Sequence, residues 1–173
     1  MYKRLLVAID GSAASQAALS QAIELAAKDG SDVRLVHVID ETIVPWDDKG
    51  PGQRERALGT LAGDSARILN DAQSALRRAG RSASSAQLVR NRWRDTASDL
   101  IAAEASRWGA DLIVIGSRGY GPIRRALAGS VDAAVMRIAP MSVLPVTSST
   151  PTRPQARPVT GRPPAAPHRV GLA

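Results

Sequence analysis

The sequence of 173 residues contains no cysteine. This absence excludes disulfides, thiolate metal sites and a cysteine nucleophile, and it is compatible with a reducing compartment. Long apolar runs are also missing, since a stretch such as Leu112 to Ile115 is far too short to cross a bilayer. Near the first residue, Asp10 interrupts the apolar run and no small-residue cleavage site follows, so we expect no signal peptide. These absences predict a cytoplasmic protein without a membrane partner.

Groups that carry out catalysis are sparse. His37 and His168 are the only histidines, and a histidine inside an apolar segment is more often a packed residue than a base. The sequence has no recognisable Ser-His-Asp set, carboxylate pair or metal-ligand cluster. The pattern ending in Gly-Lys-Ser/Thr that marks dedicated NTPases is absent as well. We therefore predict no catalytic residue and no metal held by protein ligands.

The net charge of +7 is unevenly distributed along the chain. Residues 151–173 contain four arginines and no acidic residue, which leaves only +3 for residues 1–150. The same segment holds six of the eleven prolines and few large apolar side chains, so it cannot bury enough surface to offset the entropy of ordering. We expect a folded domain over residues 1–147 and a disordered Pro/Arg-rich tail over 148–173. A nucleic-acid partner is not expected, because the tryptophans are not grouped on a basic surface.

Short apolar runs alternate with longer segments of helical period between residues 1 and 147. The runs expected to be strands are Lys3 to Ile9, Val33 to Val38, Ser85 to Val89, Asp111 to Ile115 and Ser142 to Val146. Such an alternation is typical of a parallel sheet built by right-handed crossovers, with helices covering both faces. The sequence therefore predicts a single α/β domain with a doubly wound, Rossmann-like fold.

The intervening segments carry apolar residues at three- and four-residue steps, as amphipathic helices do. The faces expected to be buried are Leu19, Ala22, Ile23 and Ala26 in the first helix, Leu58, Leu61, Ser65, Ile68, Leu69, Ala72 and Leu76 in the second, and Val131, Ala134, Val135 and Ile138 in the last. Another helix is expected to follow Thr96, with Asp99 completing a variant of the capping box, and to stop at Gly109.

A ligand of a doubly wound sheet binds beside the carboxyl ends of the strands. Asp10 lies in the turn at the end of the first expected strand, and the fourth strand ends in a glycine-rich stretch that runs from Gly116 through Gly119 to Gly129 and Ser130 before a helix begins. Small residues let backbone N–H groups turn toward one point, and the first turn of a helix offers unpaired donors to an anion. In the alternative interpretation, these glycines only make turns or end the strand and Ser130 only caps the helix.

The stretch GSRGYGPIRRALAGSV carries glycine, two residues, glycine, nine residues and Gly-Ser, with the spacing of the universal stress protein family. The segments KRLLVAIDGSAAS, LVHVID and GADLIVIGSRG are also similar to this family, so the resemblance spans about residues 2–147. Within the family, the chain resembles the subgroup that binds ATP. The resemblance implies a five-stranded sheet in the order 3-2-1-4-5 and a homodimer joined through the last strand.

The resemblance also implies roles for individual residues. Adenine and ribose would lie near Ala8, Asp10 and Val38, the ribose against Gly116, and the phosphates on Gly119, Gly129, Ser130 and the N–H of Val131, with Ser117 and Arg118 lining the loop. Magnesium would accompany the phosphates, since it keeps several waters and few protein ligands. For Asp10, the alternative is a carboxylate that caps the following helix at Ala13 or Ala14.

The chain departs from the family pattern at two places that concern function. Residues 91–95 occupy a position that more often carries a glycine, so we expect an altered rim of the cleft. Pro145 lies in the last strand, where proline is tolerated mainly at a sheet edge. Three functions remain open from sequence: an ATP-binding regulatory protein of the stress response, a nucleotide-free dimeric interaction module, and a slow ATPase.

Overall fold

The computed structural model describes residues 1–44, 52–117 and 130–148. Residues 149–173 of the predicted tail and residues 118–129 of the glycine-rich stretch lie outside these ranges. The elements follow one another as β1 (Arg4–Ala8), α1 (Ala13–Asp29), β2 (Asp32–Asp40), the short 3-10 helix η1 (Glu41–Ile43), α2 (Gln53–Arg78), β3 (Ala83–Arg90), α3 (Ala97–Trp108), β4 (Leu112–Ser117), α4 (Val131–Ile138) and β5 (Ser142–Thr147).

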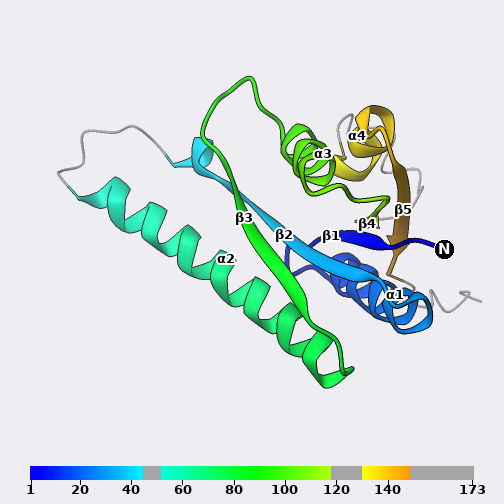
Figure 1. Ribbon diagram of the computed structural model, residues 1–173. Coiled ribbons are helices and arrows are strands. Elements are labelled where there is room, and N and C mark those ends of the chain that lie inside the picture. Colours follow the sequence, from blue (N-terminus) through cyan, green and yellow to red (C-terminus); the bar gives the residue numbers. More distant parts are fainter. Residues whose placement is uncertain (45–51, 118–129, 149–173) are drawn as a thin grey trace, which may run out of the picture.

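The five strands form one parallel sheet in the order β3-β2-β1-β4-β5, which confirms the predicted fold. Helices α1 and α2 cover one face of this sheet and α3 and α4 cover the other (Figure 1). The order along the chain reverses between β1 and β4, so the carboxyl ends of these strands flank the point at which a doubly wound sheet accepts a ligand.

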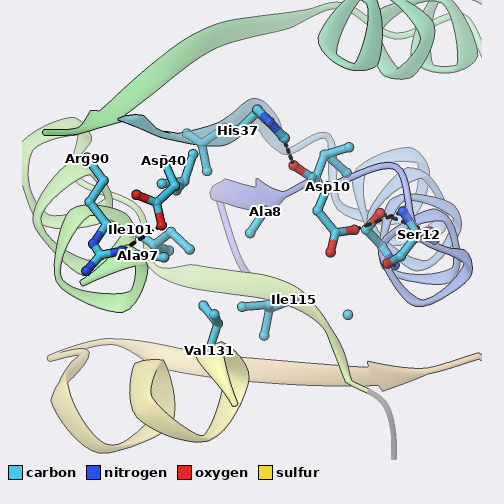
Figure 2. Close-up of a pocket in the computed structure, with 15 residues that line it drawn as sticks. Ala8, Asp10, Ser12, His37, Asp40, Arg90, Ala97, Ile101, Ile115 and Val131 are labelled. Atoms are coloured by element: carbon cyan, nitrogen blue, oxygen red, sulfur yellow. Dashed lines mark hydrogen bonds and ion pairs between the residues drawn. The ribbon is translucent and has the colours of Figure 1, made fainter. Parts of the chain in front are cut away.

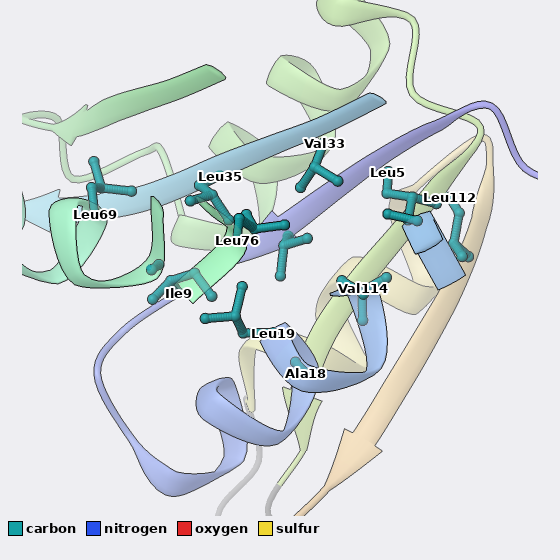
Figure 3. Packing of buried hydrophobic residues seen from close by; sticks show 14 residues of the cluster. Leu5, Ile9, Ala18, Leu19, Val33, Leu35, Leu69, Leu76, Leu112 and Val114 are labelled. Carbon is teal, nitrogen blue, oxygen red and sulfur yellow. The ribbon is translucent and has the colours of Figure 1, made fainter. Parts of the chain in front are cut away.

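Alternating strand residues supply the two halves of the core, because successive side chains of a strand point to opposite faces. Leu5 and Val7 pack with α1 and α2, whereas Leu6 packs with α3 and α4. Figure 3 shows the first of these clusters, in which Leu19 of α1 and Leu76 of α2 meet the sheet. A central strand of such a sheet is apolar along its whole length because both of its faces are covered.

Helix α2 buries only part of the face predicted for it. Ser65, Leu69, Ala72 and Leu76 are buried, as expected, but Leu58, Leu61 and Ile68 are half-buried. The helix has 26 residues and is about 39 Å long, which exceeds the roughly 30 Å of the longest strand, β2. Its first turns therefore have less of the sheet to pack against.

Helix α4 differs more strongly from the prediction. Val135 is fully buried, but Val131 and Ile138 are 40% and 44% exposed, and Asp132 is buried instead at 4%. Val131 is the first residue of the eight-residue helix and Ile138 is the last, so the exposed residues are the two ends of the predicted apolar face. The prediction that this whole apolar face is buried is therefore wrong.

The start of α3 follows the predicted capping box. The Thr96 hydroxyl accepts a hydrogen bond from the N–H of Asp99 at 3.2 Å, and the Asp99 carboxylate accepts one from the N–H of Thr96 at 2.9 Å. Gly109 ends the helix in the left-handed region, with φ at 71°. These contacts fix the position of Ala97 at the carboxyl edge of the sheet.

Several strands continue beyond the residues expected from sequence. Asp40 and Arg90 are partners in the last register pair of β2 and β3. Gly116 and Ser117 pair with Val146 and Thr147, so they belong to β4 and not to a loop. Neighbouring strands supply the backbone partners that hold these polar and small residues in extended conformation.

Candidate functional site

A pocket of about 240 Å³ opens at the carboxyl ends of β1, β2 and β4, on the face of the sheet covered by α3 and α4. It is lined by Ala8, Ile9, Asp10, Ser12, Ser15, Val36, His37, Val38, Asp40, Arg90, Ala97, Ile101, Ile115, Gly116 and Val131. Figure 2 shows apolar side chains in the middle, with Asp10 and Ser12 at one end and Asp40 and Arg90 at the other. Ligand pockets commonly combine an apolar lining with a few placed polar groups.

Asp10 follows β1 and is held by the turn into α1. Its carboxylate accepts a hydrogen bond from the N–H of Ser12 at 2.9 Å. Ser12 is itself the N-cap of α1, because its hydroxyl accepts from the N–H of Ser15 at 3.2 Å. The alternative role of Asp10 as the cap of this helix is therefore wrong.

Asp10 remains ionised despite its surroundings. Burial raises the pKa of its carboxyl. Hydrogen bonds from Ser12 and Ser15 and the charge of the nearby His37 lower this pKa and together outweigh the effect of burial, so it lies below the ordinary value. An ionised carboxylate has only acceptor sites. Asp10 can therefore accept hydrogen bonds from hydroxyl groups of a ligand.

Gly116 lines the pocket through its backbone and has a second role in packing. A Cβ added at this position would lie 2.5 Å from the carbonyl carbon of Ala14 and 2.6 Å from the nitrogen of Ser15. The N-terminal turn of α1 thus packs directly on the backbone of β4, and only glycine leaves room for it. The glycine brings Ser12 and Ser15 to the pocket.

His37 borders the pocket from β2, and its ring is hydrogen-bonded to the backbone of Ile9. The distance from Nδ1 to the carbonyl oxygen of Ile9 is 2.7 Å. Because a carbonyl only accepts, Nδ1 carries the hydrogen in this contact. His37 is half-buried, and this backbone contact fixes the orientation of its ring.

Asp40 and Arg90 form an ion pair at the opposite end of the pocket from Asp10. Arg90 Nη1 lies 2.6 Å from Asp40 Oδ2, and Arg90 Nε donates to the carbonyl oxygen of Asp95 at 2.6 Å. Burial raises the pKa of Asp40, but hydrogen bonds from Thr42 and Arg90 outweigh it and lower the pKa below its ordinary value. The sequence prediction omitted this pair because only the register of β2 and β3 reveals it, although it lies beside the divergent segment 91–95.

The residues predicted to bind the nucleotide fall into three groups. Ala8, Asp10, Val38, Gly116 and Val131 line the pocket. Ser117 is buried in β4 at 2% exposure, and Ser130 is the N-cap of α4; neither is among the lining residues. Arg118, Gly119 and Gly129 lie outside the described residues.

Sequence reasoning also missed the apolar lining from α3, Ala97 and Ile101. Their apolar spacing along α3 was a signal for burial, but it did not say that they would border a pocket. Among the described residues, no three histidine or acidic side chains are grouped so that they could hold a metal ion. Within those same ranges, no helix is long and apolar enough to cross a membrane.

Fold and pocket together define a doubly wound α/β protein with a pocket at the carboxyl edge of its sheet, where such folds bind ligands. The model of the universal stress protein family matches residues 1–147. The chain therefore belongs to this family. A relative from Staphylococcus haemolyticus, named as a universal stress protein, is 28% identical over 147 residues, which cover 84% of each chain.

Two solved structures of similar proteins contain adenine nucleotides. One is a universal stress protein in complex with cAMP, which is 26% identical, has a TM-score of 0.65, and is similar over 86% of this chain and 99% of that one. The other is the universal stress protein from Archaeoglobus fulgidus in complex with dAMP. It is 26% identical with a TM-score of 0.59, over 84% of this chain and 98% of that one.

Proposed function

We propose that this protein binds ATP in the pocket at the carboxyl edge of the sheet and acts as a cytoplasmic regulator, through a nucleotide-dependent conformation or partner. The observation that carries the proposal is the distribution of polarity in the pocket. An apolar middle, lined by Ala8, Ile101 and Ile115, separates the ionised Asp10 from a second polar end. A nucleoside has a matching distribution of polarity, because the apolar faces of its flat base are joined to a ribose that carries hydroxyl donors.

The residues present fit such a ligand. Asp10 would accept from a ribose hydroxyl, and the apolar side chains would cover the faces of the base. Val131 borders the pocket as the first residue of α4, so its N–H is one of the donors that a helix leaves without an intrahelical partner. This N–H would face the phosphates, together with the glycines at 119 and 129 that precede it in the chain. Magnesium bound to the phosphates would neutralise part of their charge and keep most of its own water ligands.

The similar proteins that contain cAMP and dAMP support a ligand of the adenine nucleotide class. ATP is the member of this class that would use the glycine-rich stretch fully, because its three phosphates need the most donors. The family's spacing of Gly116, Gly119, Gly129 and Ser130 is intact in this chain. The glycine spacing is therefore the reason to propose ATP and not a nucleoside.

Equilibrium titration with a fluorescent ATP analogue, followed by competition with ATP and AMP, tests the proposal. Asp10→Ala should weaken ATP binding about tenfold, which corresponds to the loss of one hydrogen bond to a charged group. Gly129→Glu should weaken it more, since both the new side chain and its negative charge oppose the phosphates. Asp71→Ala is the matched control, because Asp71 is an exposed carboxylate on α2 that does not line the pocket.

The outcome for Gly129→Glu decides between ATP and the other possible functions. If this variant melts at the same temperature as the wild type and binds ATP as tightly, the glycine-rich stretch does not hold phosphate. A nucleotide-free interaction module would then be the better description. Phosphate release, measured in the same samples and compared with the Gly129→Glu variant, would show whether the bound ATP is slowly hydrolysed.

A further inference from the structure

The pocket has a second polar end, and neither the glycine-rich stretch nor Asp10 accounts for it. Asp40 ends β2, Arg90 ends β3, and both line the pocket across its apolar middle from Asp10 (Figure 2). Their side chains are 33% and 21% exposed, so the ion pair is neither fully solvated nor shut away from a ligand. A ligand that reaches Asp10 with its ribose would bring the far edge of its base toward this pair.

Asp40 has the chemistry of a group that accepts one further hydrogen bond. Its Oδ1 accepts from the N–H of Thr42 at 3.0 Å and from the Thr42 hydroxyl, while its Oδ2 accepts from Arg90 Nη1 at 2.6 Å. Each carboxylate oxygen has two acceptor sites, so Oδ2 retains one beyond these contacts. An ionised carboxylate cannot donate, and it therefore disfavours a ligand edge that presents only an acceptor.

Arg90 holds this carboxylate in place from the neighbouring strand. Besides its ion pair with Asp40, it donates from Nη1 to the Thr42 hydroxyl at 3.2 Å and from Nε to the carbonyl oxygen of Asp95 at 2.6 Å. These contacts connect β2, β3 and the segment that leads into α3, whose first residue Ala97 also lines the pocket. Arg90 is thus a positioning residue, and its planar guanidinium suits several fixed acceptors better than a lysine ammonium does.

We propose that Asp40, positioned by Arg90, selects the base of the bound nucleotide by accepting a hydrogen bond from the 6-amino group of a purine. The pocket then prefers 6-aminopurines over 6-oxopurines, because a carbonyl oxygen in the same place would face the carboxylate with no hydrogen between them. Apolar side chains from Ala97 and Ile101 cover the base and leave this polar edge as its specific contact. The inference rests on the proposed nucleotide site and names the residue that determines its selectivity.

The test compares ATP with inosine triphosphate, which carries an oxygen at position 6 in place of the amino group and a hydrogen on the adjacent N1. The wild type should bind ATP about tenfold or more tightly than inosine triphosphate, as expected for a site that loses a hydrogen bond to a charged group. Asp40→Asn should bring this ratio close to one, because an amide can rotate to donate to the 6-oxo group as readily as it accepts from the 6-amino group. Asp10→Asn is the matched control at the other end of the pocket, and it should weaken both ligands while leaving their ratio unchanged.

Arg90→Gln provides an independent second variant, in case Asp40→Asn alters the fold. Without the guanidinium, the Asp40 carboxylate loses its fixed position, so the ratio of the two affinities should fall severalfold while both nucleotides still bind. Arg90→Lys should restore part of the preference, since it keeps the charge beside Asp40. A residue with only a structural role would change both affinities together and would show no such rescue.

The outcomes separate this inference from the function on which it rests. If the wild type binds neither nucleotide, the proposed function itself has failed. If the wild type binds ATP but Asp40→Asn and Arg90→Gln keep the wild-type ratio, the base is recognised elsewhere and only the role of Asp40 is overturned. A wild type that binds both triphosphates equally would overturn it as well.

Discussion

Replacing Gly116 by alanine should destabilise the protein through packing, whatever the pocket binds. The added Cβ would lie 2.5 Å from Ala14 C, 2.6 Å from Ser15 N and 2.7 Å from Ala14 O. All of these are backbone atoms of α1, so no flexible side chain can move aside. Either the helix shifts away from β4 or the strand bends, and both lose contacts in the close-packed core.

Overpacking of this kind costs about 1–3 kcal/mol, and rigid backbone on every side places Gly116→Ala near the upper figure. For a protein of this size, about 3 kcal/mol corresponds to a melting temperature lowered by roughly 6–12 °C. Thermal unfolding followed by circular dichroism measures the change directly. Ser12, the N-cap of α1, lines the pocket, so a shift of this helix should also lower the affinity for the nucleotide.

Gly63→Ala is the matched control, since Gly63 lies inside α2 and a Cβ there would meet nothing within 4 Å. Alanine is favoured over glycine in a helix by about 1 kcal/mol, so this variant should melt slightly higher than the wild type. The two glycine-to-alanine changes should therefore have opposite signs. If Gly116→Ala melts at the wild-type temperature, α1 does not pack against β4 as closely as the structure has it, and the packing role of Gly116 is refuted.

Three further predictions concern acid, assembly and the tail. The pKa of Asp10 is lowered from 3.8 in the folded state, so its stabilising contribution is present above that value and is lost as the pH falls below it. The difference in unfolding free energy between wild type and Asp10→Asn should therefore shrink below about pH 3.8 in urea titrations, and a constant difference would contradict this. Sedimentation equilibrium should report a dimer, because β5 is an edge strand with half-buried apolar residues, and Val146→Glu should dissociate it. A wild-type monomer at tens of micromolar would contradict the dimer. Removing residues 151–173 should leave the melting temperature and ATP affinity unchanged, and a fall of many degrees would show that the tail packs on the domain.

The fold could be predicted because its determinants are local in the sequence. Runs such as Leu112 to Ile115 are apolar on both faces, which indicates a buried parallel strand, and Thr96 with Asp99 indicates the start of a helix. Pro145 also lies where its chemistry requires, on an edge strand. Burial of α4 was predicted less well, because an eight-residue helix is too short for periodicity to show how far its ends are covered.

The pocket residues also differ in whether they could be predicted from sequence, because some depend on local sequence and others on tertiary contacts. Asp10 could be predicted as a lining residue because it comes two residues after the end of β1, and that end lies at the carboxyl edge of the sheet. The pairing of Asp40 with Arg90 could not, since the two residues are 50 positions apart and meet only through the register of β2 with β3. The packing role of Gly116 was hidden for a similar reason, because nothing in a glycine indicates which distant backbone occupies the space of its missing side chain.

The proposed site has some residues that would contact groups common to all nucleotides and others that would contact the base, so base selectivity can vary while the fold stays the same. The glycine spacing and Asp10 would contact phosphates and ribose, which all nucleotides share, so these residues cannot distinguish one base from another. The polar end formed by Asp40 and Arg90 would lie beside the part of the base in which nucleotides differ. Arg90 donates to the carbonyl oxygen of Asp95, in the segment that departs from the family pattern. Changes in that segment would alter the position of the Asp40 carboxylate without disturbing the sheet, because residues 91–95 follow the last strand pair, which is Asp40 with Arg90. Base selectivity should therefore follow the residues between β3 and α3, and exchanging residues 91–95 for a shorter glycine-containing segment should change the ratio of ATP to inosine triphosphate affinity more than it changes the affinity for ATP.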